Sequence, residues 1–267
     1  MKIVTSYHEP DLDGVSCMYA YTELLNRKSE NVEYFIWGKP KQEVNIVCNI
    51  FGIELKYKRV EEIPENSEFI IVDLNGKEQL HSMIKPDKII EIVDHHGLSR
   101  WLQSYTSIKR LQIDKVGAAA TIITERYMTS GLVPSRESAI LLFYGIISNS
   151  INLKSNITEQ RDIEACQWLK NICKDISDEK IKEIFIKKSN IKDCNLRFEM
   201  ECEIPNTFPD FKVIIAQLEI ANLDSFLKEK QQQILNIMQS VKREKKVDYI
   251  FINCVDILNG YIIILPA

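Results

Sequence analysis

The chain has 267 residues, of which 45% are hydrophobic and 27% are charged, and its formal net charge is −4. This length and apolar content suit one large packed domain or two ordinary ones. The slightly acidic balance argues against a strongly basic nucleic-acid surface. No apolar run reaches the roughly 20 residues that a transmembrane helix needs, so we expect no membrane span.

The first part of the chain alternates between strand-like and helix-like segments. Continuous apolar runs predict strands over residues 2–6, 32–37, 69–72 and 88–93, with an edge strand over 107–112. Helical patterns occupy residues 15–26, 41–50, 116–128, 137–147 and 158–172, the last with Thr158 as its candidate N-cap. Apolar strands separated by helices are typical of a parallel sheet covered on both faces, which predicts a Rossmann-like α/β domain.

A polar, charged stretch begins at residue 174 and reaches about residue 195. We place the domain junction within it, with a first domain over residues 1–187 and a second over 188–267. Strands are predicted over 211–218, 249–255 and 261–267, and a long helix over 223–241. The second domain is therefore expected to be a smaller α/β unit.

Seven cysteines occur, at positions 17, 48, 166, 173, 194, 202 and 254. Their number is odd and no two of them have CxxC spacing, so we expect no disulfides. This usage suits a reducing compartment, and we expect a cytoplasmic protein.

Imidazole and carboxylate groups gather in two short segments and at one strand end between them. Each group follows a predicted strand, and the carboxyl ends of parallel strands converge on one crevice. Such ligands suit divalent metals such as Mn, Fe or Zn, so the pattern predicts a metal site. A turn capped by a single aspartate is the alternative for the first segment. The side chains are His8, Asp11, Asp13, Asp73, Asp94, His95 and His96.

These segments resemble the DHH phosphoesterase superfamily, which is named for the Asp-His-His triplet found here at residues 94–96. Four motifs match in the family's order, at residues 8–14, 73, 94–96 and 117–121. Residues 213–219 and 248–258 are similar to the DHHA2-type second domain of the branch that contains manganese-dependent, family II inorganic pyrophosphatases. The branch that degrades very short RNA instead carries a GGGH signature there, and this chain has no Gly-Gly pair.

The resemblance implies a site for two Mn²⁺ ions, with Mg²⁺ or Co²⁺ as alternatives, about 3.5–4 Å apart. It also implies that His96 contacts the phosphoryl group and assists the leaving oxygen, while Asp94 orients a histidine ring. The implied metal ligands are His8 and Asp11 for one ion, Asp13 and His95 for the other, and Asp73 as the bridge between them.

The chain departs from the pyrophosphatase pattern at three places. Asn149 stands where the family has an aspartate ligand, and its amide oxygen brings no charge, so the second metal should bind more weakly. Arg197 is the one candidate cation where the family has a lysine in an Asp-x-Lys-x-Phe segment. The late Ser-Arg-Lys-Lys phosphate clamp is absent, so we expect the second domain to be short at its C-terminal end.

The leading hypothesis is a divalent-metal-dependent phosphoesterase that hydrolyses a phosphoanhydride or phosphoester. Pyrophosphate, short polyphosphate and a small nucleotide are the candidate substrates. The alternative is a weakly active or non-catalytic relative that binds a phosphorylated ligand, and an oligonucleotide phosphodiesterase is a third reading. We expect a small phosphorylated partner, no membrane, no nucleic-acid platform, and a subunit that could pair as a homodimer.

Overall fold

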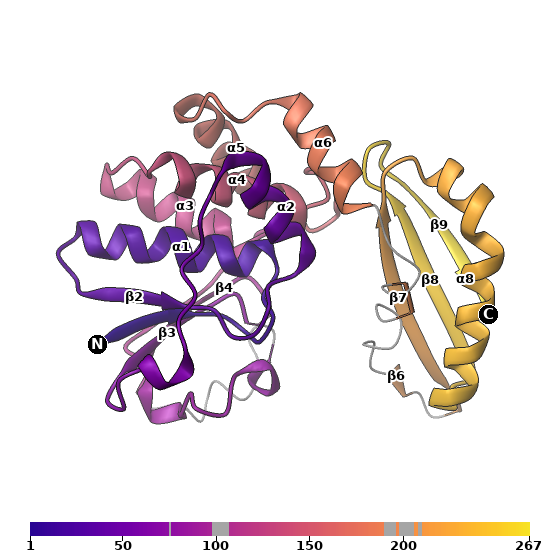
Figure 1. Cartoon of the computed structure of the whole chain (residues 1–267), viewed down its shortest axis with the longest axis horizontal. Coiled ribbons are helices and arrows are strands. Elements are labelled where there is room, and N and C mark those ends of the chain that lie inside the picture. Colours follow the sequence, from indigo (N-terminus) through magenta and orange to yellow (C-terminus); the bar gives the residue numbers. More distant parts are fainter. Residues whose placement is uncertain (75, 98–106, 190–195, 198–205, 208–209) are drawn as a thin grey trace. The chain divides into compact units, whose positions relative to one another are not determined.

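The computed structural model describes residues 1–74, 76–97, 107–189, 196–197, 206–207 and 210–267 (Figure 1). The backbone divides into two compact units, Met1–Ile181 and Lys182–Ala267. The division lies within helix α6 (Asp178–Lys188), whereas the junction expected from sequence falls at the end of that helix.

The first unit contains a five-stranded sheet in the order β2-β1-β3-β4-β5, and all of its strand pairs are parallel. The strand order changes direction between β1 and β3, because the chain moves outward to β2 and then returns to the other side of β1. Such a switch point is where open α/β sheets bind their ligands. The strands are β1 (Lys2–Thr5), β2 (Val32–Phe35), β3 (Glu68–Val72), β4 (Ile89–Asp94) and β5 (Arg110–Ile113).

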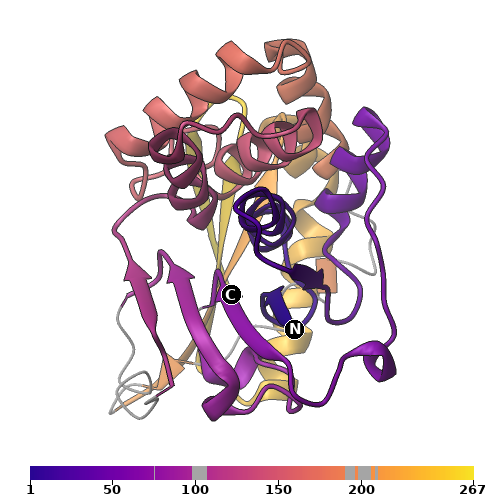
Figure 2. The same cartoon turned by 90° about the vertical axis from the view of Figure 1, so that its left-hand side faces the viewer.

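The helices of this unit form a layer on one side of the sheet (Figures 1 and 2). Helix α1 contacts β1, β2 and β3, while α3 contacts β4 and α4 packs against α1 and α3. The other face is covered by apolar residues from loops and short 3-10 turns, among them Val60, Ile63, Leu80 and Ile84. The sheet is therefore covered on both faces, but among the described residues helices supply only one of them. The helices are α1 (Leu12–Arg27), α2 (Gln42–Phe51), α3 (Ala119–Ser130), α4 (Arg136–Asn149) and α5 (Gln160–Ile172).

Helix α5 begins two residues later than its sequence pattern predicted. Its N-cap is Glu159, whose backbone N–H donates to the carboxylate of Asp162 at 2.8 Å. Thr158 is therefore not the N-cap, and its hydroxyl oxygen has no hydrogen-bond partner within the described part of the chain. The N3 carboxylate satisfies the first backbone donor, as in a capping box, so the threonine hydroxyl is not needed there.

The second unit is a smaller α/β structure with a four-stranded sheet in the order β6-β7-β8-β9. Strands β7 (Lys212–Ile220) and β8 (Tyr249–Asp256) are parallel and are joined by helix α8 (Leu223–Lys245). Strands β6 (Asn206–Thr207) and β9 (Tyr261–Pro266) pair antiparallel at the two edges. One face of α8 buries Ile234, Met238 and Val241 in the core of this unit. Across the residues that the structure describes, no helix is both long and apolar enough to cross a membrane.

Candidate metal centre

Polar side chains follow three neighbouring strands at the carboxyl edge of the first unit's sheet. Asp73 comes directly after β3, Asp94 is the last residue of β4, and His95 and His96 begin the next loop. Since β1 and β3 flank the switch point in the strand order, these groups gather where the fold predicts a ligand site. The segment between β1 and the first turn of α1 supplies His8, Asp11 and Asp13.

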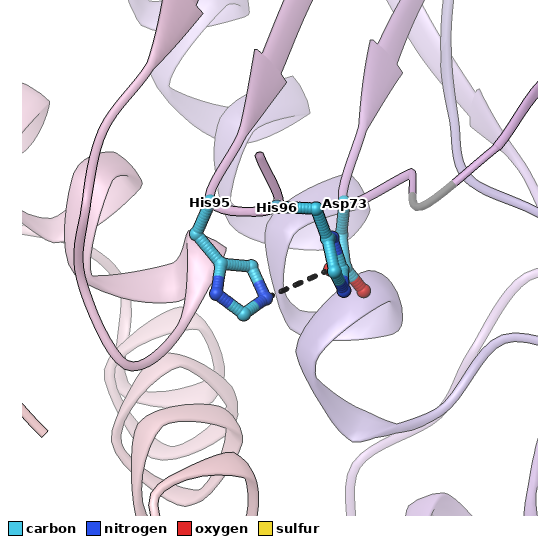
Figure 3. Close-up of side chains that lie close together, drawn as sticks. All are labelled: Asp73, His95 and His96. Carbon is cyan, nitrogen blue, oxygen red and sulfur yellow. Dashed lines mark ion pairs between the residues drawn. The ribbon is translucent and has the colours of Figure 1, made fainter. Parts of the chain in front are cut away.

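Asp73, His95 and His96 form the centre of this group (Figure 3). Asp73 Oδ1 lies 3.5 Å from His95 Nε2 and 3.8 Å from His96 Nδ1. Two ligand atoms that share one metal at bond lengths of about 2.0–2.2 Å are at most about 4.4 Å apart. The distance from Asp73 to His95 meets that limit, so these two side chains already have a spacing that a shared ion allows.

Asp73 is held in an unusual backbone conformation. Its φ is 52°, in the left-handed region, and its side chain is buried at 2% exposure. Aspartate tolerates this region better than most residues, but the conformation still costs about 1 kcal/mol or more. The carbonyl oxygen of Asp73 accepts a hydrogen bond from Ser6 Oγ at 3.0 Å, which ties the turn to the end of β1.

The ring of His95 is oriented by the backbone of the loop before α3. Its Nδ1 lies 3.1 Å from the carbonyl oxygen of Val116, which favours the tautomer with the proton on Nδ1. Its Nε2 then faces the carboxylates of Asp73 and Asp13, the latter at 3.7 Å. Burial opposes a charge on this ring, but the hydrogen bond to Asp73 and the negative charge of Asp13 outweigh it and raise the pKa of His95 to about 9.

Asp94 positions the second histidine of the triplet. Asp94 Oδ1 lies 2.9 Å from His96 Nδ1 and also accepts the backbone N–H groups of Leu74, His95 and His96. With Nδ1 bound to this carboxylate, Nε2 of His96 is the nitrogen that can act on a ligand. The side chain of His96 is 32% exposed and lines the cavity described below.

Asp13 lies beneath this cluster and is almost completely buried. Its two carboxylate oxygens accept the backbone N–H groups of Ala119 and Ala120, each at 2.8 Å, at the start of α3. Burial and repulsion from Asp73 nevertheless raise the pKa of Asp13 to about 7. The side chain is thus anchored to α3 while its negative charge lacks sufficient compensation.

Asp11 is the N-cap of α1, and its Oδ1 accepts the backbone N–H of Gly14 at 3.1 Å. Burial, followed by the charges of Asp73 and Glu43, raises the pKa of Asp11 well above its ordinary value. Glu43 is a buried carboxylate that the sequence pattern did not identify, and it accepts the N–H of Leu12 at 3.0 Å. This concentration of carboxylates is electrostatically unfavourable unless a cation compensates it.

A cavity of about 600 Å³ opens beside these groups. Its lining includes a set of five residues that the sequence placed in the site: His8, Asp11, Asp73, His96 and Asn149. Its size falls within the range of small-molecule sites in proteins. His8 is the most exposed of the five, and its imidazole lies against Gly38, where an added Cβ would come within 2.8 Å of His8 Cε1.

Asn149 is the last residue of α4 and joins the cluster through its amide group. Asn149 Nδ2 donates to the carbonyl oxygen of Gly117 at 2.7 Å and lies 3.4 Å from His95 Nε2. The three residues after Ser150 all have positive φ values, of 51°, 54° and 59° at Ile151, Asn152 and Leu153. Such strain is rare for Ile and Leu, and it tends to collect at functional sites.

Arg197, the expected substrate cation of the second domain, interacts within its own unit. Its guanidinium lies 2.5 Å from Glu244 and within 3.4 Å of Ser240 Oγ. The neighbouring residues 193–195 and 198, which completed the motif in the sequence, lie outside the described residues.

Three further residues belong to the site or its support, although the sequence did not indicate them. Lys41, at the start of α2, and His81 both line the cavity. Asp162 on α5 is completely buried and accepts the backbone N–H of Gly117 at 2.7 Å. No local pattern reveals such contacts, because they join segments distant in sequence.

The DHH family, N-terminal domain, matches residues 2–146, which is more than half of the chain and includes the site segments on β1, β3 and β4. The chain belongs to the DHH family. Curated relatives of this DHH protein include a probable manganese-dependent inorganic pyrophosphatase of Clostridium acetobutylicum. It is 28% identical over 244 residues, and the match covers 90% of this chain and 77% of the relative. A protein of the same description from Brevibacillus brevis is 26% identical over 276 residues, covering 97% of this chain and 83% of the relative.

Solved structures share the fold of this DHH protein. A putative family II inorganic pyrophosphatase of Methanococcus jannaschii matches with a TM-score of 0.72 and 24% identity, covering 100% of this chain and 88% of that one. An exopolyphosphatase-related protein from Bacteroides fragilis matches with a TM-score of 0.57 and 14% identity, covering 98% of this chain and 77% of that one. The α/β architecture with a smaller second unit is therefore common to these proteins.

Proposed function

We propose that this DHH protein is a divalent-metal-dependent phosphohydrolase that uses Mn²⁺ and acts on a small phosphoanhydride or phosphoester. The observation that carries the proposal is the spacing of Asp73 and His95, with His96 beside them, at the switch point of the sheet. The relatives described as manganese-dependent pyrophosphatases, which align with 90% and 97% of the chain, support it. Pyrophosphate, short polyphosphate and a small nucleotide are the candidate substrates.

The donor set suits a divalent ion such as Mn²⁺. The raised pKa values of Asp11 and Asp13 indicate more negative charge than the protein alone compensates, and a cation would relieve it. A bound pair of divalent ions supplies Lewis-acid polarisation of the phosphoryl oxygens and lowers the pKa of a nucleophilic water. In our proposal the ligands are His8 and Asp11 for one ion, Asp13 and His95 for the other, Asp73 for both, and the amide oxygen of Asn149 for the second.

His96 is the residue that we assign to the phosphoryl group. Asp94 binds Nδ1 of its ring, so Nε2 is directed away from Asp94 and can donate a proton to the leaving oxygen. Asp94 thus acts as a positioning residue, and its replacement should lower kcat more than it changes KM.

Binding of an anionic substrate also needs positive charge beyond the metals. Lys41 lines the cavity at the start of α2, and its ammonium group can approach a bound phosphate. Arg197 remains our proposed cation of the second domain, and for that role it must exchange its contact with Glu244 for the substrate.

All five cysteines in the described part of the chain are unpaired, which supports our proposal of a cytoplasmic location.

One observation favours a second candidate function. Asn149 places a neutral amide where the family has a carboxylate, so this chain could bind a phosphorylated ligand and turn it over slowly. The two functions differ in the rate of phosphate release, not in the ligand that they recognise.

A substrate panel tests the proposal. Purified protein is incubated with Mn²⁺ and pyrophosphate, tripolyphosphate, a cyclic dinucleotide or a short RNA, and released phosphate or mononucleotide is measured. We expect metal-dependent release from at least one compound and a large loss with Asp73→Ala. Asp87→Ala, on the 3-10 turn before β4 and outside the cavity lining, is the matched control. No release from any compound, with tight binding of one of them, would favour the binding function.

A further inference from the structure

A second cavity adjoins the metal cavity at the carboxyl end of edge strand β2. Its volume is about 410 Å³, and His8 and His81 line both cavities. The volume falls within the range of small-molecule sites. A substrate whose phosphoryl group lies at the metal centre can therefore extend past these two histidines into a further compartment.

Aromatic rings form much of the wall of this second cavity. Trp37 follows β2 and is 2% exposed, and the ring of His81 stacks on it with a centroid distance of 4.0 Å and an interplanar angle of 8°. Tyr57 also lines the cavity, and 57% of this large side chain is exposed. A solvent-exposed aromatic ring beside a cavity is a stacking surface that the fold itself does not use.

The same wall contains polar groups that suit a ligand with hydrogen-bond acceptors. Lys58 and Arg59 follow Tyr57 in the sequence and also line the cavity, and Lys58 pairs with Glu33 of β2. Tyr57 is thus followed by two cationic side chains, and Glu61 of the same segment also lines the cavity.

Gly38 determines how His8 lies between the two cavities. Its φ is 72°, and an added Cβ would meet His8 Cε1 at 2.8 Å and Glu9 Cγ at 2.9 Å. Only glycine allows the backbone to approach the imidazole this closely in that conformation. The ring of His8 is thus positioned at the boundary, where it can serve the metal centre and contact a ligand that extends beyond it.

We propose that the second cavity binds the nucleoside part of a phosphoester substrate, with the base stacked on Tyr57. The inference rests on the proposed phosphohydrolase function and narrows its substrate class to nucleotides. Inorganic pyrophosphate has no group that could occupy an aromatic compartment, whereas a nucleobase has a planar face that can stack on Tyr57. Arg59 then lies beside the base or a further phosphate.

Equilibrium binding tests this proposal without depending on turnover. The Mn²⁺-loaded protein is titrated by calorimetry with AMP and with ribose 5-phosphate, which is the same ligand without its base. We expect AMP to bind about tenfold more tightly, since stacking of one base on an aromatic side chain is worth about 1–3 kcal/mol. Tyr57→Ala should remove this preference, and Tyr57→Phe should retain it.

Tyr249→Ala provides the matched control, because Tyr249 is 50% exposed and belongs to the second unit, away from this cavity's lining. It should leave the preference for AMP unchanged. Equal affinities for AMP and ribose 5-phosphate, or no measurable binding of AMP, would overturn the inference. If tripolyphosphate is hydrolysed but AMP and ribose 5-phosphate bind equally tightly, the nucleoside inference fails and the proposed function stands. If AMP binds more tightly but no panel compound is hydrolysed, the proposed function fails and the nucleoside site stands.

Discussion

Replacement of Asp162 by alanine should weaken metal binding although Asp162 touches none of the proposed ligands. Its buried carboxylate accepts the N–H of Gly117 and the hydroxyl of Thr121, and so holds the loop before α3. That loop supplies the carbonyl of Val116 to His95 and the carbonyl of Gly117 to Asn149. The backbone N–H groups of Ala119 and Ala120, which follow this loop, donate to the carboxylate of Asp13.

The size of the effect follows from these contacts. Asp162→Ala leaves the N–H groups of Gly117 and Glu159 and the hydroxyl of Thr121 without their partner, at about 1–3 kcal/mol for each group that stays buried and unsatisfied. We expect a loss of about 2–4 kcal/mol in the free energy of unfolding, because the hydroxyl can partly rearrange. Loss of a residue that orients metal ligands typically lowers metal affinity about tenfold to a hundredfold, and we expect that range for Mn²⁺.

The assay combines denaturant unfolding with Mn²⁺ titration calorimetry. Asp256→Ala is the matched control, because Asp256 is equally buried and accepts the backbone N–H groups of Leu223, Leu258 and Asn259 in the second unit. It should lower stability similarly and leave Mn²⁺ affinity unchanged. Asp162→Asn should retain much of the stability and of the Mn²⁺ affinity, since its amide oxygen can still accept the backbone N–H of Gly117. Unchanged Mn²⁺ affinity in Asp162→Ala would refute the reasoning.

The remaining predictions concern charge at the site. Asn149→Asp adds a carboxylate and should tighten the weaker of two Mn²⁺ sites in titration calorimetry, whereas two equally tight sites in the natural protein would contradict this. The pKa values of Asp13 and His95 are raised to about 7 and 9, so the metal-free folded protein binds protons that the unfolded chain has released. The stability of the metal-free protein should therefore fall as pH rises from about 4 to 9. Mn²⁺ competes with these protons, so the increase in Tm that it produces should become larger between pH 6 and 9. An increase in Tm that does not change with pH would argue against these groups as ligands. Arg197→Ala should lower kcat/KM tenfold to a hundredfold if the guanidinium leaves Glu244 for the phosphate, and unchanged kinetics would remove it from the site.

The position of the centre could be predicted because it depends on local sequence. The strands predicted over residues 2–6, 69–72 and 88–93 each end at ligand-type residues, and parallel strands bring such ends together at one edge. Asp73 and His95 therefore lie side by side as the pattern indicated. The Asp-His-His triplet was informative for the same reason, since consecutive residues after a strand contact different neighbours: His95 faces Asp73, whereas His96 is bound by Asp94.

The supporting residues could not be predicted, because their contacts join segments far apart in the chain. Gly117 and Asp162 are 45 positions apart, and their hydrogen bond depends on how α5 packs beside α3. His81 appeared isolated in the sequence, yet the fold stacks its ring on Trp37 at the border of two cavities. Thr158 was a reasonable capping residue by type, but the carboxylate of Asp162 takes the backbone donor instead.

Anomalous diffraction at the manganese edge, from crystals grown with Mn²⁺, tests the central proposal most directly. We predict a peak within about 2.0–2.3 Å of a carboxylate oxygen of Asp73 and of His95 Nε2. A second, weaker peak should lie about 3.5–4 Å from the first, since Asn149 adds no charge to its site. The absence of manganese between Asp73 and His95, with manganese bound elsewhere on the chain, would contradict the proposed centre.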